Sequence, residues 1–327
     1  MLRQYQIPLS ILAMLATSAW LSAQHPNTPI FKQSGTAIGE VREEIIRQAL
    51  QVRKQVAAIS KEEIDAQLIN PVPETIQLPP PFADTMSPEG IARHARENNL
   101  RVGYCYLCMN CDDWHLNLAG GYAIAKDVIA TCDHVLVNKT KMRDGFLVVV
   151  DHEGNVACAV AILARSPAMD AAIVKVAGAD FTPVPLNSDV MQGAEAFCFS
   201  YPLRQEGYFS TGVVNRFFWN EKYQGEDTES IDALVHLRAN FSTDWAPGSS
   251  GSPLFDAAGN VIGHVSTISG LSRGNRQPAL MMLRTGIPAL AVRNLANHLE
   301  TPAEIQRIAM IGAGVPESPE NGDDSEK

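Results

Sequence analysis

The chain has 327 residues, of which 46% are hydrophobic and 19% are charged. This composition is typical of a globular protein that can bury a core in one large domain or two small ones. The formal net charge of -10 argues against a nucleic-acid partner, because binding phosphates requires clustered Lys and Arg.

Residues 1–23 are predicted to be a signal peptide. Arg3 precedes a mostly apolar run over residues 7–21, and the small residues Ser22 and Ala23 suit a cleavage site before Gln24. An uncleaved membrane anchor is the alternative, although the run is short for a full span. No later segment is long and apolar enough to span a bilayer, so we expect an exported protein, periplasmic or secreted, without membrane association after cleavage.

Residues 24–86 are predicted to form a helical extension and a proline-rich linker. After a polar leader, apolar residues recur at intervals of three and four from Ile38 to Ile59, which predicts an amphipathic helix. Ser60 and Glu63 resemble a capping box that begins a second helix. Residues 71–87 contain five prolines and are expected to be extended. We expect the first helix to pack against the following domain; self-association or partner binding is the alternative.

Residues 87–300 are predicted to form one domain, which begins with a helix at Ser87-Pro88 and is then all-β. Many short apolar or alternating runs over about two hundred residues suggest a sandwich or a pair of barrels. A final helix is predicted near residues 288–300, and the acidic residues 301–327 are expected to be disordered. The predicted strands are 101–107, 116–125, 128–131, 146–150, 157–164, 171–176, 194–200, 212–218, 233–239, 253–255 and 261–268.

The chain contains six cysteines, and three of them, Cys105, Cys108 and Cys111, lie in a C-x-x-C-x-x-C cluster. In an exported protein we expect disulfides, although the sequence does not determine their pairing. A zinc site formed by the cluster and His115 is the alternative, because thiolates and one imidazole suit tetrahedral coordination.

Three local patterns point to nucleophilic catalysis. Ser250 lies in the Gly/Ser-rich turn 247–253, where Gly248 and Gly251 permit the unusual backbone angles that expose a hydroxyl. His134 follows a predicted buried strand, and Asp170 precedes another. Each pattern alone is compatible with an ordinary turn, but a base, an acid and a nucleophile together fit a Ser–His–Asp system.

The blocks around these three residues resemble the trypsin-like (chymotrypsin-fold) serine peptidase superfamily, and most of all its HtrA-like bacterial branch. They read Thr-Cys-Asp-His-Val at His134, Asp-Ala-Ala-Ile-Val-Lys-Val from Asp170, and Pro-Gly-Ser-Ser-Gly-Ser-Pro-Leu around Ser250. The resemblance covers roughly residues 100–300 and implies two six-stranded antiparallel β-barrels. It predicts an enzyme without metal or organic cofactor that cleaves polypeptides.

The resemblance also implies residue roles. Ser250 would attack the scissile carbonyl, His134 would transfer its proton and Asp170 would orient His134. The N–H groups of Gly248 and Ser250 would form the oxyanion hole. Ser249 replaces the acid that activates digestive relatives, and residues 301–327 are too few for a C-terminal PDZ domain.

Specificity is only weakly predicted. Asp244 occupies the position where trypsin-like enzymes carry an acid that binds Arg or Lys, and a solvated loop acid is the alternative. By analogy, Ser266, Thr267 and Ile268 are expected to line one wall of the cleft. A catalytically silent relative that binds peptides, or acts as a chaperone or scaffold, is the competing interpretation of the whole chain.

Overall fold

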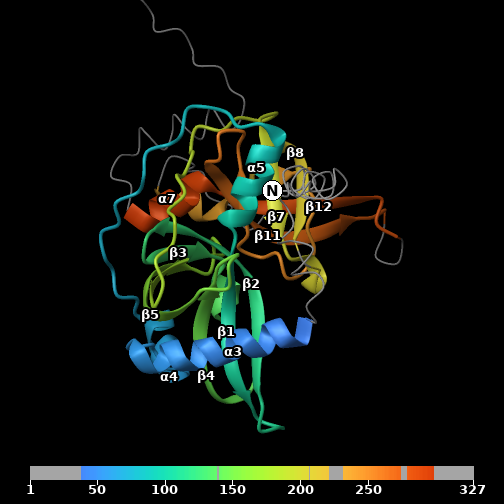
Figure 1. Ribbon diagram of the computed structural model, residues 1–327. Helices are drawn as coiled ribbons and strands as arrows, with labels where there is room; N and C mark the ends of the chain where they lie inside the picture. The colour runs from blue at the N-terminus through green and yellow to red at the C-terminus, as the bar shows by residue number, and fades with distance from the viewer. Residues whose placement is uncertain (1–37, 138–139, 206, 221–230, 274–277, 298–327) are drawn as a thin grey trace, which may run out of the picture. The chain divides into compact units, whose positions relative to one another are not determined.

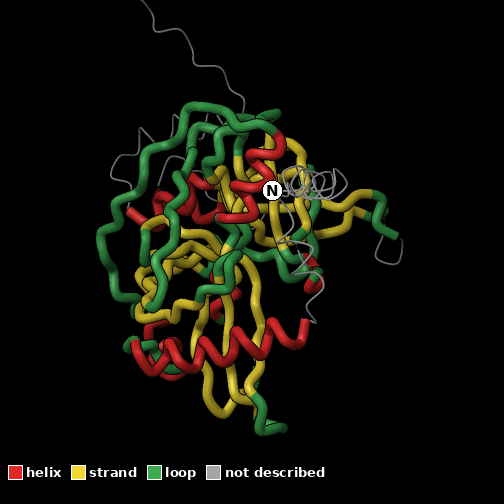
Figure 2. Tube along the Cα trace, in the orientation of Figure 1, coloured by secondary structure: helices red, strands yellow, loops and turns green. Residues whose placement is uncertain are grey.

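The structure is a computed structural model that describes residues 38–137, 140–205, 207–220, 231–273 and 278–297. Its strands form two closed six-stranded antiparallel barrels, with the orders β1-β2-β3-β6-β5-β4 and β10-β11-β12-β9-β8-β7 (Figure 1). Figure 2 shows the strands gathered in these two groups. The predicted all-β class with two barrels is confirmed.

The first barrel is closed by β1, which pairs with both β2 and β4. Val102, for example, lies opposite Ala119 on one side and Val149 on the other. Alternate residues point inward and form a buried cluster that includes Tyr104, Leu147 and Ile162. The strands are β1 (Leu100–Cys108), β2 (Trp114–Ala125), β3 (Val128–Thr131), β4 (Met142–Val150), β5 (Val156–Ser166) and β6 (Ala171–Ala177), with the one-turn helix α6 (Asp133–Leu136) after β3.

The second barrel contains the Gly/Ser-rich turn of Ser250, which lies between β9 and β10. Its strands are β7 (Glu195–Ser200), β8 (Tyr208–Trp219), β9 (Leu237–Phe241), β10 (Pro253–Phe255), β11 (Val261–Leu271) and β12 (Met281–Pro288). The short helices η1 (Pro202–Arg204) and η2 (Ile231–His236) and the final helix α7 (Ala289–Asn297) accompany them.

Two predictions for this barrel were wrong. Residues 233–236 are 3-10 helix rather than strand, and the carbonyls of Val235 and Leu237 accept hydrogen bonds from Arg238. The strand β12 was not predicted as a strand, because its exposed half lacks a clear alternation of apolar and polar residues.

Three helices precede the barrels: α3 (Ile38–Gln55), α4 (Lys61–Ile69) and α5 (Pro88–Glu97). The predicted capping box is confirmed, because the Ser60 side chain accepts from the Glu63 N–H while the Glu63 carboxylate accepts from the Ser60 N–H. Ser87 caps α5 through the Gly90 N–H, and Pro88 occupies the first helical turn.

The predicted extension contributes to the core of the first barrel. Ile59 and Ile64 belong to the same buried cluster as the residues inside that barrel. In α3, Ile45 and Ala49 are buried, and Arg53 binds Asp144 of β4 at 2.7 Å. Packing of this helix against the domain is therefore confirmed from Ile45 onward, while self-association stays a prediction.

Several predicted segments lie outside the described residues. They are the signal peptide at 1–23, the leader at 24–37 and the acidic tail at 301–327. Within the described part of the chain, no helix is both long and apolar enough to cross a membrane.

The expected disulfides are absent from the structure. All six cysteines lie among the described residues, and each is a free thiol. Two of the buried sulfurs have a backbone carbonyl as partner: Val265 at 3.1 Å for Cys132 and Ala49 at 3.9 Å for Cys158.

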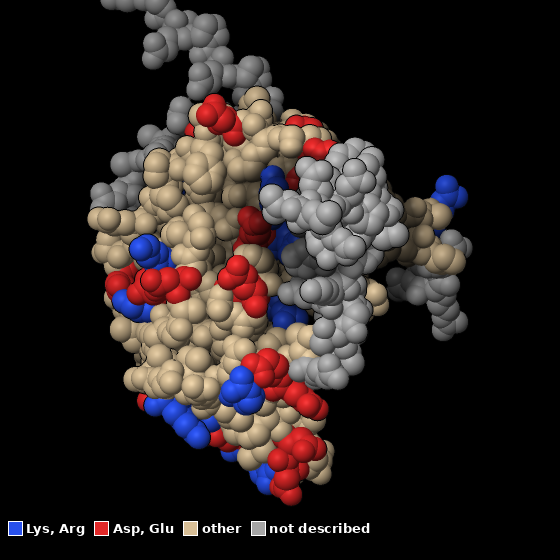
Figure 3. Space-filling model, viewed as in Figure 1, with Lys and Arg blue, Asp and Glu red and all other residues tan. Residues whose placement is uncertain are grey.

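Charged side chains of both signs are interspersed on the face seen in Figure 3, where several red and blue patches touch. Some of these opposite charges form ion pairs between neighbouring elements. Lys175 of β6, for example, binds Glu74 of the proline-rich segment at 2.6 Å. Because the Lys175–Glu74 pair is partly exposed to solvent, it contributes only up to about 1 kcal/mol.

Candidate active site

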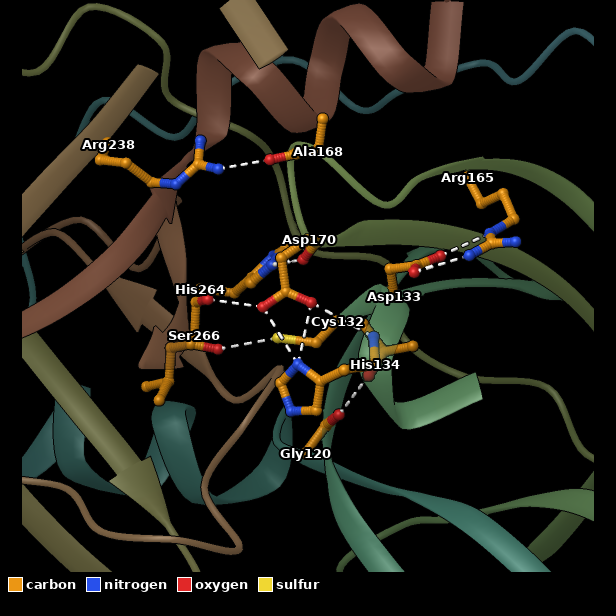
Figure 4. Close-up of polar contacts among 12 residues, drawn as sticks. Gly120, Cys132, Asp133, His134, Arg165, Ala168, Asp170, Arg238, His264 and Ser266 are labelled. Carbon is orange, nitrogen blue, oxygen red and sulfur yellow. Dashed lines mark hydrogen bonds and ion pairs between the residues drawn. The ribbon is translucent and has the colours of Figure 1, made fainter. Parts of the chain in front are cut away.

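His134 lies in the one-turn helix α6, directly after the fully buried strand β3. The preceding residue, Asp133, anchors this turn to β5. Both of its carboxylate oxygens accept from Arg165, at 2.6 and 2.8 Å, and its side chain is only 7% exposed (Figure 4). Arg165 also donates to the Leu68 carbonyl at the end of α4. The histidine is therefore held by a buried bidentate ion pair one residue away.

The imidazole of His134 faces the carboxylate of Asp170. Nδ1 lies 2.8 Å from Oδ1 and 3.1 Å from Oδ2, and the His134 backbone N–H donates to Oδ1 at 3.2 Å (Figure 4). Because an ionised carboxylate only accepts hydrogen bonds, Nδ1 carries the proton and Nε2 is the acceptor in the neutral ring. The His134 side chain is 51% exposed, whereas that of Asp170 is 19% exposed. The imidazole thus faces solvent and the carboxylate lies behind it.

Asp170 owes its position to the turn between β5 and β6. Its N–H donates to the Ser166 carbonyl at 2.9 Å, and its φ of 65° lies in the left-handed region. The buried Arg238, from the second barrel, donates to the Ala168 carbonyl at 2.5 Å. Aspartate tolerates left-handed angles better than most residues, so this turn costs little at Asp170.

Two residues of β11 complete the surroundings of Asp170. The Ser266 hydroxyl donates to Oδ2 at 2.5 Å, and His264 Nε2 lies 3.3 Å from the Asp170 carbonyl oxygen. On its other side, His264 Nδ1 lies 3.3 Å from the Tyr122 hydroxyl. The sequence analysis assigned Ser266 to a cleft wall, and it predicted neither contact with Asp170.

These contacts shift the pKa values in opposite directions. The hydrogen bond with Asp170 is the main cause that raises the pKa of His134, against the effect of burial. For Asp170, burial is the largest single contribution and raises the pKa, but the hydrogen bonds and charge of His134, together with Ser266, lower it overall. Burial lowers the pKa of His264 to about 4, so this ring is neutral near neutral pH.

Ser250 lies in a turn formed by two glycines with positive φ, Gly248 at 103° and Gly251 at 81°. The Ser250 carbonyl accepts from the N–H of Gly120 in β2 at 2.7 Å, and the Gly251 N–H donates to the Val265 carbonyl at 2.7 Å. A Cβ on Gly251 would lie 2.4 Å from the Gly120 carbonyl oxygen. Only glycine allows this approach, and no local pattern indicates the contact of Gly120 with this turn.

The orientation of the Pro247–Gly248 peptide follows from a contact outside the turn. The Pro247 carbonyl accepts from the Leu203 N–H at 2.7 Å. The peptide is trans, so the Gly248 N–H points the opposite way. Within the described residues, neither this N–H nor that of Ser250 donates to a protein acceptor. Both donors are therefore free to bind an oxyanion.

The structure joins His134 to Asp170 directly, but no hydrogen bond joins the Ser250 hydroxyl to His134 in the described part of the chain. The two segments are nevertheless adjacent, since a Cβ on Gly251 would lie 3.1 Å from the backbone nitrogen of Cys132. Catalytic hydrogen bonds are often long before substrate binds, so this geometry is compatible with a later Ser–His contact.

The predicted specificity residues have other contacts. The Asp244 carboxylate forms an ion pair with Arg284 at 2.5 Å. Thr267 is exposed, and its carbonyl accepts from the Trp245 indole at 3.2 Å, while Ile268 is half-buried. The negative charge of Asp244 is thus already paired with a cation of the same chain.

One group beside His134 could in principle hold a metal ion, since donor atoms of Cys132, His134 and Asp170 lie within 4.8 Å of one another. The Cys132 thiol is completely buried, and burial, followed by the charge of Asp170, raises its pKa well above the usual value. A protonated thiol is a poor metal ligand, because the thiolate is the form that binds. This group therefore fits a hydrogen-bonded acid–base pair better than a metal centre.

Comparisons with known proteins agree with this geometry. Residues 119–263 match the family of trypsin-like peptidase domains. A "Probable periplasmic serine endoprotease DegP-like" from Pseudomonas fulva (strain 12-X) is 25% identical over 193 residues, which are 58% of this chain and 36% of the relative. The chain thus spans about a third of the length of that curated relative.

Among solved structures, a serine endoprotease from Yersinia pestis is similar over 69% of this chain and 68% of its own, with 16% identity and a TM-score of 0.46. The sequence matches support a peptidase at the level of the family. Residues 119–263 are thus similar to trypsin-like peptidase domains, the two barrels agree with that similarity, and the curated relative is described as DegP-like.

Proposed function

We propose that this protein is an exported serine endopeptidase that uses Ser250, His134 and Asp170. The hydrogen-bonded pair of His134 and Asp170, adjacent to the glycine turn that exposes Ser250, is the observation that carries the proposal. Export rests on the predicted signal peptide and on the similarity to a relative described as periplasmic.

The proposed reaction has two halves. The Ser250 hydroxyl attacks the scissile carbonyl carbon while His134 Nε2 takes its proton, and Asp170 stabilises the imidazolium through Nδ1. The peptide C–N bond then breaks, and His134 gives the proton to the leaving amine. Water repeats the sequence on the acyl-enzyme, which releases the acid and restores Ser250.

The negative charge of each tetrahedral intermediate would lie on the carbonyl oxygen of the substrate. The free N–H groups of Gly248 and Ser250 are suited to bind it, and one such donor is worth about 3 kcal/mol. The Leu203–Pro247 hydrogen bond supports this role, because it fixes the peptide that carries the Gly248 donor.

The proposal does not include a preference for cleavage after Arg or Lys. In that role Asp244 would have to release Arg284, which holds it at 2.5 Å. We expect substrates to be unfolded polypeptides with uncharged side chains before the cleaved bond. Mass spectrometry of casein fragments would reveal an Arg or Lys preference if this expectation is wrong.

A fluorophosphonate probe tests the proposal, since it reacts with activated serines. The wild-type chain should be labelled at Ser250 and should cleave casein, whereas Ser250→Ala should do neither. Ser252→Ala is the matched control, because the Ser252 hydroxyl is buried and has no hydrogen-bond partner among the described residues. A folded wild-type protein that resists the probe would instead favour the silent, peptide-binding interpretation.

A further inference from the structure

The hairpin between β1 and β2 carries a second cluster of reactive side chains, which the proposed peptidase reaction does not use. Donor atoms of Cys108, Cys111 and His115 lie within 4.8 Å of one another, and Cys111 Sγ is 3.1 Å from His115 Nε2. His115 is separated from Gly120, the β2 residue that contacts Ser250, by about 16 Å of extended strand. The cluster is therefore a distinct site on the first barrel (Figure 1).

We propose that Cys108, Cys111 and His115 bind one zinc ion, with a solvent molecule as the fourth ligand. Two thiolates and an imidazole are ligands that Zn²⁺ prefers, and sites with three protein ligands are common. With bonds of about 2.0–2.3 Å, ligand atoms of a tetrahedral site lie about 3.3–3.8 Å apart. All three donor atoms lie within 4.8 Å of one another, so forming the site would change these separations by about 1.5 Å at most.

Backbone N–H groups of the hairpin lie close to the two sulfurs. The Asn110 N–H donates to Cys108 Sγ at 3.3 Å, and the Cys111 N–H points to the same sulfur. The Asp113 N–H in turn points to Cys111 Sγ. Such hydrogen bonds stabilise thiolates, which are the species that bind metals.

The ligand positions are also fixed before any ion binds. Arg143 of β4 donates to the carbonyls of Cys108 and Cys111, at 2.7 and 2.5 Å. The Cys108 N–H donates to the Asp113 carbonyl at 3.2 Å, and the His115 ring packs against Tyr106 with centroids 5.5 Å apart. Because the loop is held on both sides, binding would cost little conformational entropy.

The same two cysteines could instead form a disulfide, as the sequence analysis expected. That arrangement would leave His115 without a role, although its ring nitrogen is hydrogen-bonded to Cys111. A metal ion bound by all three side chains explains this contact, so we favour zinc.

Titration of the full-length chain tests the proposal. The protein is purified with a reductant, stripped with a chelator and titrated with Co²⁺. We expect one Co²⁺ per chain, a thiolate-to-cobalt charge-transfer absorption in the near ultraviolet, and loss of that absorption on adding one equivalent of Zn²⁺. Cys108→Ser, Cys111→Ser and His115→Gln should each weaken binding about 100-fold or more, beyond the cost of losing a supporting hydrogen bond.

Two control variants separate ligation from folding. Cys198→Ala removes a buried thiol of β7, and His152→Gln removes a histidine of another turn; both should bind cobalt like the wild type. Circular dichroism and thermal unfolding check that each ligand variant is folded.

The proposal fails if the reduced wild-type protein gives no charge-transfer band, or if the ligand variants bind as well as the controls. A Cys108–Cys111 disulfide whose reduction yields no metal binding would equally overturn it. Because the signal is an absorption band, it is independent of whether Ser250 is a nucleophile.

Discussion

The residues of the candidate active site are positioned by different kinds of contact in the two barrels. In the first barrel, side chains position His134 and Asp170 through charged hydrogen bonds, such as the fork between Arg165 and Asp133. In the second barrel, the turn of Ser250 is held by backbone contacts at glycines and at Leu203. We therefore expect substitutions in the first barrel to change charge and proton transfer, and substitutions in the second to change geometry.

The strongest test of this contrast is Asp170→Asn, which keeps the size of the side chain and removes its charge. Under the proposed function, kcat should fall about 10⁴-fold, because the amide stabilises neither the imidazolium nor the correct tautomer of His134. The measurement is kcat/KM on a fluorogenic peptide from pH 5 to 9. Loss of Asp170 should also shift the acidic limb of the profile to lower pH, since this carboxylate raises the pKa of His134.

Asp151→Asn is the matched control, because Asp151 lies in the turn that connects β4 to β5. A decrease in kcat of less than tenfold for Asp170→Asn would show that the charge of Asp170 is not essential to the function of His134.

In the second barrel, Gly251→Ala adds a single methyl group. That methyl would meet the Gly120 carbonyl oxygen at 2.4 Å and the Thr131 hydroxyl at 2.5 Å, on a backbone with φ of 81°. We expect about a 10³-fold loss of activity or a destabilisation of about 3 kcal/mol. Gly193→Ala has a similar φ of 89° but open space around it, so it should cost only about 1 kcal/mol.

Denaturant unfolding and peptide hydrolysis on the two variants separate crowding from backbone strain. Equal effects at Gly251 and Gly193 would mean that the contact with Gly120 is unimportant.

The next effect concerns stability and pH. Burial lowers the pKa of His264 from 6.5 to about 4. Between these two pH values the imidazole is protonated in the unfolded chain and neutral in the folded chain. The free energy of unfolding is therefore highest above pH 6.5, and this residue should reduce it by about 3 kcal/mol as the pH falls to 4. Urea unfolding at pH 7, 5.5 and 4 measures the decrease.

His264→Gln should flatten this profile, whereas His152→Gln should leave it unchanged. A steep profile that persists in His264→Gln would assign the pH dependence to other groups.

The smallest predicted effect on activity concerns the backbone hydrogen bond between Leu203 and Pro247 in the second barrel. Leu203→Pro removes the N–H that binds the Pro247 carbonyl and excludes the left-handed φ of 50° at this position. With one oxyanion donor misplaced, kcat should fall about 100-fold while KM changes little. Leu203→Gly keeps the N–H and allows the angle, so its kcat should stay near that of the wild type; similar losses in both variants would contradict the proposed role of the hydrogen bond.

The sequence predicted the parts of the site that are local. The segments around His134, Asp170 and Ser250 each combine a buried strand with a turn, and such patterns are visible within about ten residues. It could not predict Ser266 as a donor to Asp170 or Arg238 as a donor to Ala168, because these contacts join residues 96 and 70 positions apart. A hydroxyl or guanidinium has no local feature that indicates its distant partner.

The fold was predicted in class and in most strands, and the misses have physical causes. Strand β12 begins with exposed Met281 and Met282, so its pattern resembles a loop until it enters the barrel. The disulfides were inferred from the expected compartment alone. Whether two thiols face each other depends on strand register, which was not available from composition.

Strand order has a practical consequence for handling this chain. The segment recognised by family comparison, residues 119–263, omits β1 and β12, yet β1 closes the first ring between β2 and β4, and β12 joins β11 to β9 in the second. A fragment cut at those limits would open both rings and expose unpaired strands that invite aggregation. A fragment that folds by itself therefore has to be much longer than residues 119–263. It has to begin at or before Ile59, because the Ile59 side chain belongs to the buried cluster of the first barrel.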